Sequence, residues 1–114
     1  MLTIEALNEF GADTKEGLAR CMGNEDFYFR LIKRSASDEG FEKLYAAVAE
    51  GDLRAGFEAA HSLKGVMANL ALTRILGPVN EITELLRAST DTDYTDLIGR
   101  IKAAQNDLIR LCEE

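Results

Sequence analysis

The stretch AHSLKG (residues 60–65) contains the only histidine of the chain, His61. Lys64 follows it by three residues and Gly65 by four. Because residues three and four apart are neighbours on a helix surface, a helical conformation would place all three on one face. The rest of the chain indicates which face that is and what surrounds it.

The apolar residues around this stretch predict the face that points to the core. At about 100° per residue, they fall within an arc of roughly 140°, as expected for a buried stripe. These residues are Leu53, Ala60, Leu63, Val66, Met67 and Leu70. The opposite face, which should be exposed, consists of Arg54, Phe57, His61, Lys64, Gly65, Ala68 and Leu72.

This exposed face has an unusual composition. A solvated helix face is normally rich in Glu, Lys and Gln, but here a glycine, an alanine and two large apolar residues surround His61. Glycine inside a helix costs about 1 kcal/mol relative to alanine, so Gly65 indicates that something large approaches the imidazole. A partly apolar patch around a reactive group is typical of a docking surface.

Capping signals predict two short helices at the N-terminus. Thr3 should cap a helix over residues 4–10 that ends at Gly11. Asp13, with Glu16 three residues later, should start a second short helix that stops by Gly23. We expect these helices to cover one end of the fold.

The longer helices are predicted from caps and apolar spacing. Asn24 should cap a helix whose Phe27, Leu31 and Ile32 face inward, and residues 35–40 should interrupt it. A helix over residues 41–50 should end at Gly51, and Asp52 should cap the histidine helix. Its end is expected at residue 70 or 72.

Two more helices complete the prediction. Thr73 should cap the first, in which Pro78 either produces a kink or moves the start to Gly77. A polar loop over residues 89–93 should precede the last helix, whose apolar residues repeat at three and four. The predicted fold class is all-α: an antiparallel four-helix bundle with one or two short N-terminal helices covering one end.

Length and composition limit the architecture and the partners. A chain of 114 residues with 46% hydrophobic composition can bury one core, so we expect a single domain over residues 1–114. A formal charge of −7 disfavours nucleic acid as a partner. Cys21 and Cys112 are far apart and no apolar run approaches the roughly 20 residues of a membrane span, so we expect a cytoplasmic protein without disulfides.

The stretch at residues 60–65, followed by Ala68-Asn69-Leu70, closely resembles the signature of histidine-containing phosphotransfer (HPt) domains of two-component phosphorelays. The resemblance extends upstream to residues 23–28 and 51–52, and downstream to Glu81-Ile82. Two positions depart from the family pattern. Ala71 stands where the family often has glycine, and Thr83 stands where it often has Glu or Gln facing the phosphorylated ring.

The resemblance implies a phosphocarrier. HPt domains accept a phosphoryl group from the aspartyl phosphate of a receiver domain and pass it to another receiver, which supplies magnesium and most of the catalytic groups. His61 would then be the phosphorylated residue, and Gly65 would leave room for the partner's loop. Arg54, Phe57, Ala68 and Leu72 would form the docking surface. We expect a monomer without a cofactor or metal of its own.

The chemistry of these residue types agrees with that role. Histidine has an ordinary pKa of about 6.5, so near neutral pH a large fraction of it is uncharged with one nitrogen lone pair free. Phosphoryl transfer needs in-line positioning and positive charge near a loose, anionic transition state, and Lys64 could supply that charge. The sequence contains no nucleotide-binding glycine-rich motif, so we expect no ATP-dependent kinase activity.

Two other functions remain compatible with the sequence. The chain could be a helical adaptor that binds a partner protein through the same face without phosphorylation. It could also be the phosphoacceptor domain of a chemotaxis-type histidine kinase. A metal enzyme is disfavoured, because one histidine and two distant cysteines do not make the usual metal sites.

Overall fold

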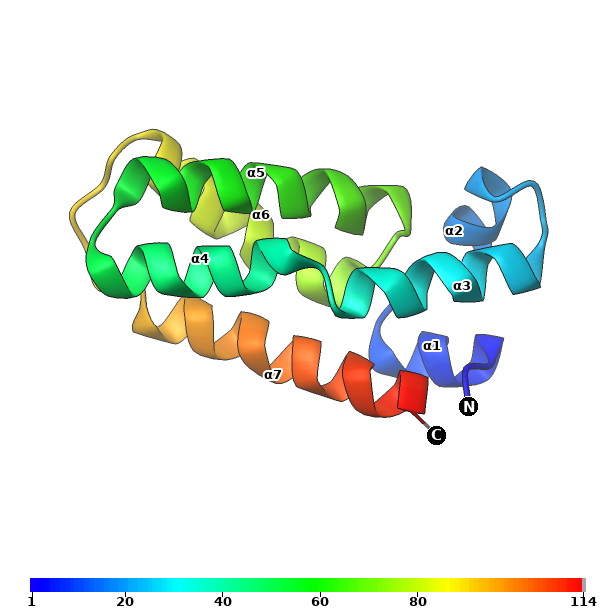
Figure 1. Ribbon diagram of the computed structural model, residues 1–114. Coiled ribbons are helices and arrows are strands. Elements are labelled where there is room, and N and C mark those ends of the chain that lie inside the picture. Colours follow the sequence, from blue (N-terminus) through cyan, green and yellow to red (C-terminus); the bar gives the residue numbers. More distant parts are fainter. Residues whose placement is uncertain (114) are drawn as a thin grey trace.

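The structure, a computed structural model, describes residues 1–113, and this part of the chain forms seven α-helices (Figure 1). Each helix is named by its position in the chain. Their bounds are α1 Ile4–Phe10, α2 Thr14–Arg20, α3 Glu25–Ala36, α4 Glu39–Glu50, α5 Leu53–Asn69, α6 Thr73–Arg87 and α7 Thr95–Glu113.

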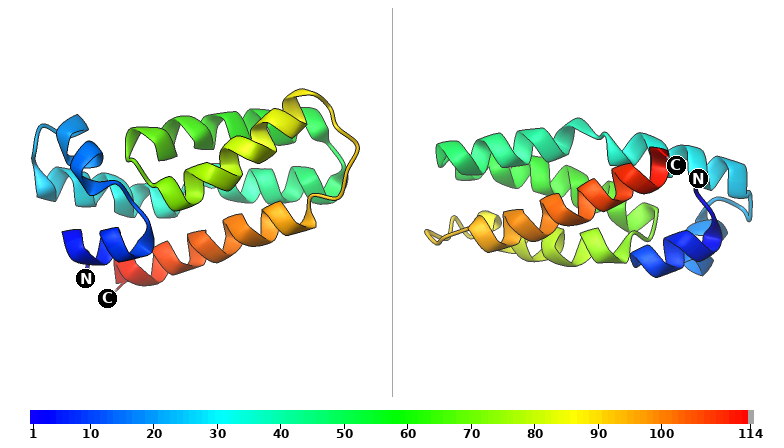
Figure 2. Two further views of the ribbon diagram at one scale, coloured as in Figure 1. Left: turned by 180° about the vertical axis from the view of Figure 1, so that it is seen from behind. Right: turned by 90° about the horizontal axis from the view of Figure 1, so that it is seen from below.

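Helices α4 to α7 form an antiparallel bundle in which consecutive helices reverse direction (Figure 1). α5 packs between α4 and α6, and α6 packs on α7. α3 precedes α4, extends away from the end of the bundle where α4 begins, and packs on α7. The molecule is elongated, with dimensions of 41 × 24 × 20 Å. α1 and α2 lie at the end of the bundle where the chain terminates (Figure 2). The predicted fold class is therefore confirmed.

Side-chain caps begin most of these helices as predicted. In each confirmed case a side-chain oxygen accepts a hydrogen bond of 3.0 to 3.2 Å from a backbone N–H three residues later. The confirmed caps are Thr3, Asp13, Asn24 and Asp52. Gly11 and Gly51 end α1 and α4 in the left-handed conformation, with φ of 118° and 75°.

The predicted start of α6 is wrong in its details. Leu72 occupies the N-cap position and provides no side-chain cap, whereas Thr73 is the first helical residue. The Thr73 hydroxyl donates to the carbonyl oxygen of Ala71 at 3.3 Å. Pro78 lies inside α6, well after its first residue, so the alternative in which the helix starts at Gly77 is wrong.

The inward face of α3 also differs from the prediction. Ile32 is buried as predicted, but Phe27 is 43% exposed and Tyr28 is buried in its place. The Tyr28 ring lies directly against Gly17 of α2, where an added Cβ would be 2.3 Å from the phenolic oxygen. This oxygen donates a hydrogen bond of 2.9 Å to the carbonyl oxygen of Leu70. The gap at Gly17 thus determines which of the neighbouring aromatic residues is buried.

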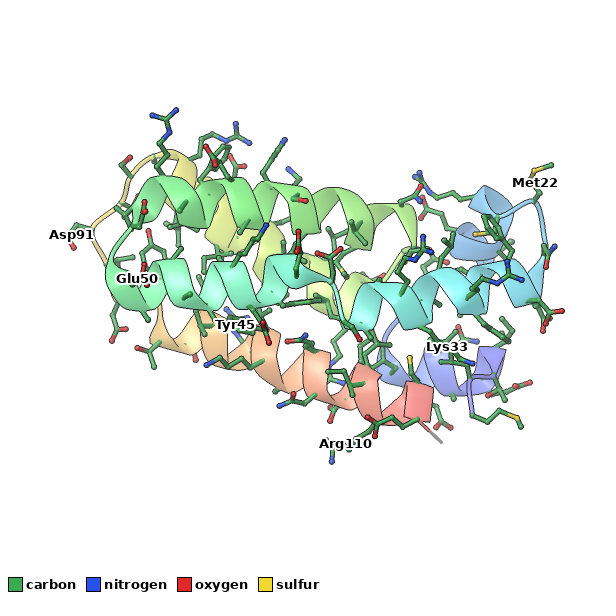
Figure 3. All side chains as sticks on the ribbon, in the orientation of Figure 1. Met22, Lys33, Tyr45, Glu50, Asp91 and Arg110 are labelled. Carbon is green, nitrogen blue, oxygen red and sulfur yellow. The ribbon has the colours of Figure 1, made fainter. Side chains whose placement is uncertain are left out.

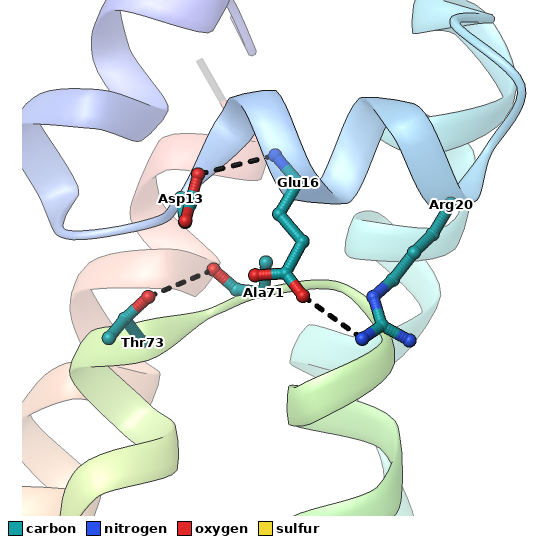
Figure 4. Close-up of polar contacts among 5 residues, drawn as sticks. All are labelled: Asp13, Glu16, Arg20, Ala71 and Thr73. Carbon is teal, nitrogen blue, oxygen red and sulfur yellow. Dashed lines mark hydrogen bonds and ion pairs between the residues drawn. The ribbon is translucent and has the colours of Figure 1, made fainter.

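The N-terminal segment holds the turn between α5 and α6 through its backbone. The N–H of Asp13 donates to the carbonyl oxygen of Ala71, and the N–H of Arg74 donates to that of Gly11, both at 2.9 Å. Figure 4 shows Asp13 beside Ala71 at this turn. Ala71 has a φ of 54°, a backbone conformation that favours glycine over alanine.

Cys21 and Cys112 are both free. Across residues 1–113, no helix combines the length and the apolar character needed to cross a bilayer.

Candidate functional site

Helix α5 presents His61 to solvent from the middle of the bundle. Ala60, which precedes His61, and Leu63, two residues after it, are completely buried against the core, as is Met67 one turn after Leu63. His61 itself is exposed. The amphipathic pattern of α5 therefore directs the imidazole outward, as the sequence predicts.

The imidazole of His61 is stacked on an aromatic ring of its own helix. The centroids of the Phe57 and His61 rings are 5.6 Å apart, and their planes differ by 20°. The guanidinium carbon of Arg87, on α6, lies 5.0 Å from the centroid of the Phe57 ring, within the range of a cation–π contact. Arg87 also forms an ion pair of 3.3 Å with Glu84.

Lys64 and Gly65 lie one turn beyond His61. Lys64 is partly exposed and Gly65 is exposed. A Cβ added to Gly65 would meet no atom within 4 Å, so packing inside this chain does not require a glycine there. Gly65 also borders a surface groove between α5 and α3, which Leu31, Arg34, Val66 and others line. The surface beside the imidazole is thus open to an approaching group.

The remaining residues predicted for the docking surface fall into two groups. Arg54 is exposed and pairs with Glu58 at 3.7 Å, and Ala68 is partly exposed on the same side of α5 as His61. Leu72, in contrast, is completely buried, so its predicted exposure is wrong. α5 ends at Asn69 and Ala71 reverses the chain, which turns Leu72 into the core instead of continuing the helical face.

The antiparallel packing of α5 on α6 shows what lies across from His61. Gly56 approaches the side chain of Leu86, and Phe57 contacts Arg87, which fixes the register of the two helices. Because the helices are antiparallel, a residue one turn later on α5 lies opposite a residue one turn earlier on α6. Thr83 therefore lies at the level of His61. Its side chain is completely buried, and its hydroxyl donates to the carbonyl oxygen of Val79 at 2.6 Å. The Thr83 hydroxyl is therefore engaged by its own helix and not by the imidazole.

One residue of α6 belongs to the surroundings of His61 but is not evident from the sequence. Arg87 reaches the Phe57 ring, on which the imidazole is stacked. Apolar periodicity identifies the buried face of a single helix but not which residues of two helices meet. The signal that locates Arg87 is the register between α5 and α6, which becomes available only with the fold.

The site contains no constellation typical of a resident metal. Among the described residues, no three His, Cys, Asp or Glu side chains are grouped closely enough to hold an ion. The chemistry available at this surface is that of an exposed imidazole, with a lysine one turn away and an open position at Gly65.

Comparison with known protein families matches the Hpt domain over residues 33–113. No curated protein and no solved structure matches the chain. The family match covers α4 to α7 and only the C-terminal end of α3, and it includes the AHSLKG stretch at residues 60–65. The chain therefore belongs to the Hpt domain family, whose members carry phosphoryl groups on histidine in phosphorelays.

Proposed function

We propose that this protein is a phosphorelay phosphocarrier in which His61 accepts a phosphoryl group from the aspartyl phosphate of one receiver domain and passes it to a second receiver. The observation that carries the proposal is the exposure of the only histidine of the chain at the middle of α5. Membership of the Hpt family supports histidine phosphotransfer, and Hpt domains generally interact with receiver domains.

The proposed reaction consists of two displacements. In the first, the lone pair of the unprotonated imidazole nitrogen of His61 forms a bond to phosphorus. The bond between phosphorus and the aspartyl oxygen breaks, and its electron pair stays on the carboxylate. In the second, a carboxylate oxygen of another receiver attacks the phosphorus, and the electron pair of the broken bond returns to the imidazole. Neither step needs ATP.

The neighbours of His61 have distinct proposed roles. Lys64 provides positive charge for the phosphoryl oxygens in a loose, negatively charged transition state. Gly65 leaves room for the receiver's active-site loop, because a side chain there would project into open space. Arg54, Phe57 and Ala68 border the docking surface. Magnesium and the remaining catalytic groups come from the receiver in this proposal, so the chain needs no cofactor of its own. We further propose that it acts as a monomer.

A phosphotransfer assay tests the proposal. The protein is incubated with receiver domains that carry labelled aspartyl phosphate, and the transferred label is tested for stability in acid and in base. We expect an acid-labile, base-stable label on the wild type and none on His61→Ala or His61→Gln. Label that persists on both variants would refute His61 as the acceptor. A wild type that binds a phosphorylated receiver but acquires no label would instead favour an adaptor.

The role of Lys64 is tested separately with Lys64→Ala. Loss of one charge-stabilising group should slow transfer by about ten- to a thousandfold. Lys43→Ala is a suitable control, because Lys43 is an exposed lysine on α4 that pairs only with a helical neighbour, Glu39, at 3.1 Å. Far-UV circular dichroism of both variants should match the wild type. A wild-type transfer rate in Lys64→Ala would remove Lys64 from the proposed site.

A further inference from the structure

The orientation of the His61 ring requires a physical cause. An exposed histidine side chain can occupy several staggered χ1 rotamers, and only some of them direct a ring nitrogen toward a docked partner. The family position at which a polar side chain often faces the ring is occupied by Thr83, whose buried hydroxyl is bonded to Val79. The contact that the structure provides to the imidazole is the Phe57 ring.

We propose that Phe57 is a positioning residue that holds the imidazole of His61 in the orientation needed for phosphoryl transfer, and that Arg87 in turn fixes the Phe57 ring. This inference rests on the proposed function, because it assigns a role in transfer through His61. In this arrangement an aromatic stack, and not a hydrogen bond, orients the imidazole.

The geometry of the stack supports this assignment. A centroid separation of 5.6 Å lies within the range of favourable aromatic pairs, and the angle of 20° between the ring planes is that of an offset stack. Phe57 and His61 are four residues apart, so α5 itself places the rings one above the other. Phe57 is only partly exposed and packs on the core, which restricts the ring on which His61 rests.

Arg87 links this stack to the neighbouring helix. Its guanidinium lies 5.0 Å from the centroid of the Phe57 ring and is paired with Glu84 on α6 at 3.3 Å. The series from Glu84 through Arg87 and Phe57 to His61 therefore connects the surface of α6 to the imidazole on α5.

Two substitutions at Phe57 separate positioning from packing and docking. Phe57→Leu keeps an apolar side chain of moderate size but removes the aromatic face, whereas Phe57→Tyr keeps the face. We expect the transfer rate at saturating receiver, which does not depend on docking affinity, to fall about two- to tenfold in Phe57→Leu and to fall less in Phe57→Tyr. Phe29→Leu is the control, because Phe29 is a partly buried phenylalanine on α3.

Proton NMR of the free protein reports the stack without any transfer reaction. Because the chain has one histidine, the ring C–H resonances of His61 can be identified directly. The ring current of Phe57 should displace them upfield in the wild type and in Phe57→Tyr. In Phe57→Leu they should move toward the position of an unstacked histidine.

The role of Arg87 has a closely matched control. Arg74 lies over the Phe10 ring at the same distance of 5.0 Å and also pairs with a carboxylate, that of Asp107. Arg87→Gln should shift the His61 resonances and slow transfer about two- to fivefold, whereas Arg74→Gln should change neither.

The outcomes distinguish this inference from the proposed function. A wild type that acquires no label from any phosphorylated receiver refutes the proposed function, while the NMR experiment still shows whether the stack exists. If the wild type transfers normally, an unchanged rate or unchanged His61 resonances in Phe57→Leu overturn the positioning role alone. A raised half-saturating concentration at an unchanged maximal rate would leave Phe57 with its docking role alone and would also overturn the positioning role.

Discussion

Replacing Gly65 by alanine should change folding stability and phosphoryl transfer in opposite directions. Gly65 lies within α5, and a Cβ at this position meets no atom within 4 Å. Alanine is favoured over glycine in a helix interior by about 0.5 to 1 kcal/mol. Since no clash offsets this gain, the free energy of unfolding should rise by about that amount, and Tm should rise by about 2 to 4 °C.

The same methyl group should hinder the partner. We assign the open position at Gly65 to the receiver's active-site loop, so the added Cβ would occupy space in the docked complex. Overpacking of a well-fitted contact typically costs about 1 to 3 kcal/mol, which corresponds to a loss of about 5- to 160-fold in transfer. A larger side chain, as in Gly65→Gln, should reduce transfer further.

Gly99→Ala provides the matched control for this experiment. Gly99 lies within α7, and a Cβ there also meets no atom within 4 Å. Urea unfolding followed by far-UV circular dichroism should show a similar stabilisation for both alanine variants. Transfer from a phosphorylated receiver should be slowed only in Gly65→Ala. A wild-type transfer rate in Gly65→Ala would refute the proposal that the receiver's loop occupies the space beside Gly65. A lower free energy of unfolding in Gly65→Ala would show that this space is not open in the free protein.

Three further predictions concern stability. Gly17→Ala should lower the free energy of unfolding by about 1 to 3 kcal/mol in urea titrations, because its Cβ would lie 2.3 Å from the phenolic oxygen of Tyr28; unchanged stability would refute that contact. Met22→Gly should raise Tm by relieving about 1 kcal/mol of strain, since Met22 has a φ of 59° and is 93% exposed, so little packing is lost. The hydrogen bond from Arg74 holds the pKa of Asp107 below its ordinary value, so the stability that Asp107 contributes is present above about pH 4 and is lost as pH falls through the lowered pKa. Asp107→Asn should therefore have a lower free energy of unfolding at neutral pH, and this free energy should fall less steeply than that of the wild type as pH decreases below about 4. Urea unfolding at a series of pH values measures both effects, and a pH dependence identical to the wild type would contradict the stabilising role of the Arg74–Asp107 pair.

Local sequence signals predicted the helices well where each signal is complete within a few residues. A cap such as Asp52 needs only its own side chain and the N–H groups of the next turn, and Gly51 needs only its own freedom to adopt a positive φ. The exposure of His61 follows from the apolar periodicity of α5 alone. These features depend on local geometry that the sequence specifies directly.

Predictions failed where a distant segment decides the outcome. The run of aromatic residues at 27–29 offers several inward faces, and the gap at Gly17 on another helix selects Tyr28 instead of Phe27. Leu72 was assigned by extending the helical face of α5, but Ala71 adopts a left-handed conformation and directs Leu72 into the core. Arg87 could not be connected with Phe57 before the register of α5 on α6 was known.

The attachment of the N-terminal segment to the turn after α5 has a consequence for cooperative opening. The amide of Asp13 is bonded to Ala71 and that of Arg74 to Gly11, so detachment of this segment breaks both bonds in a single event. Hydrogen exchange at these two amides, which are far apart in the chain, should therefore proceed through one shared opening. Residues 1–32 precede the Hpt match, so the segment that protects the end of the histidine helix lies largely outside the part of the chain common to the family.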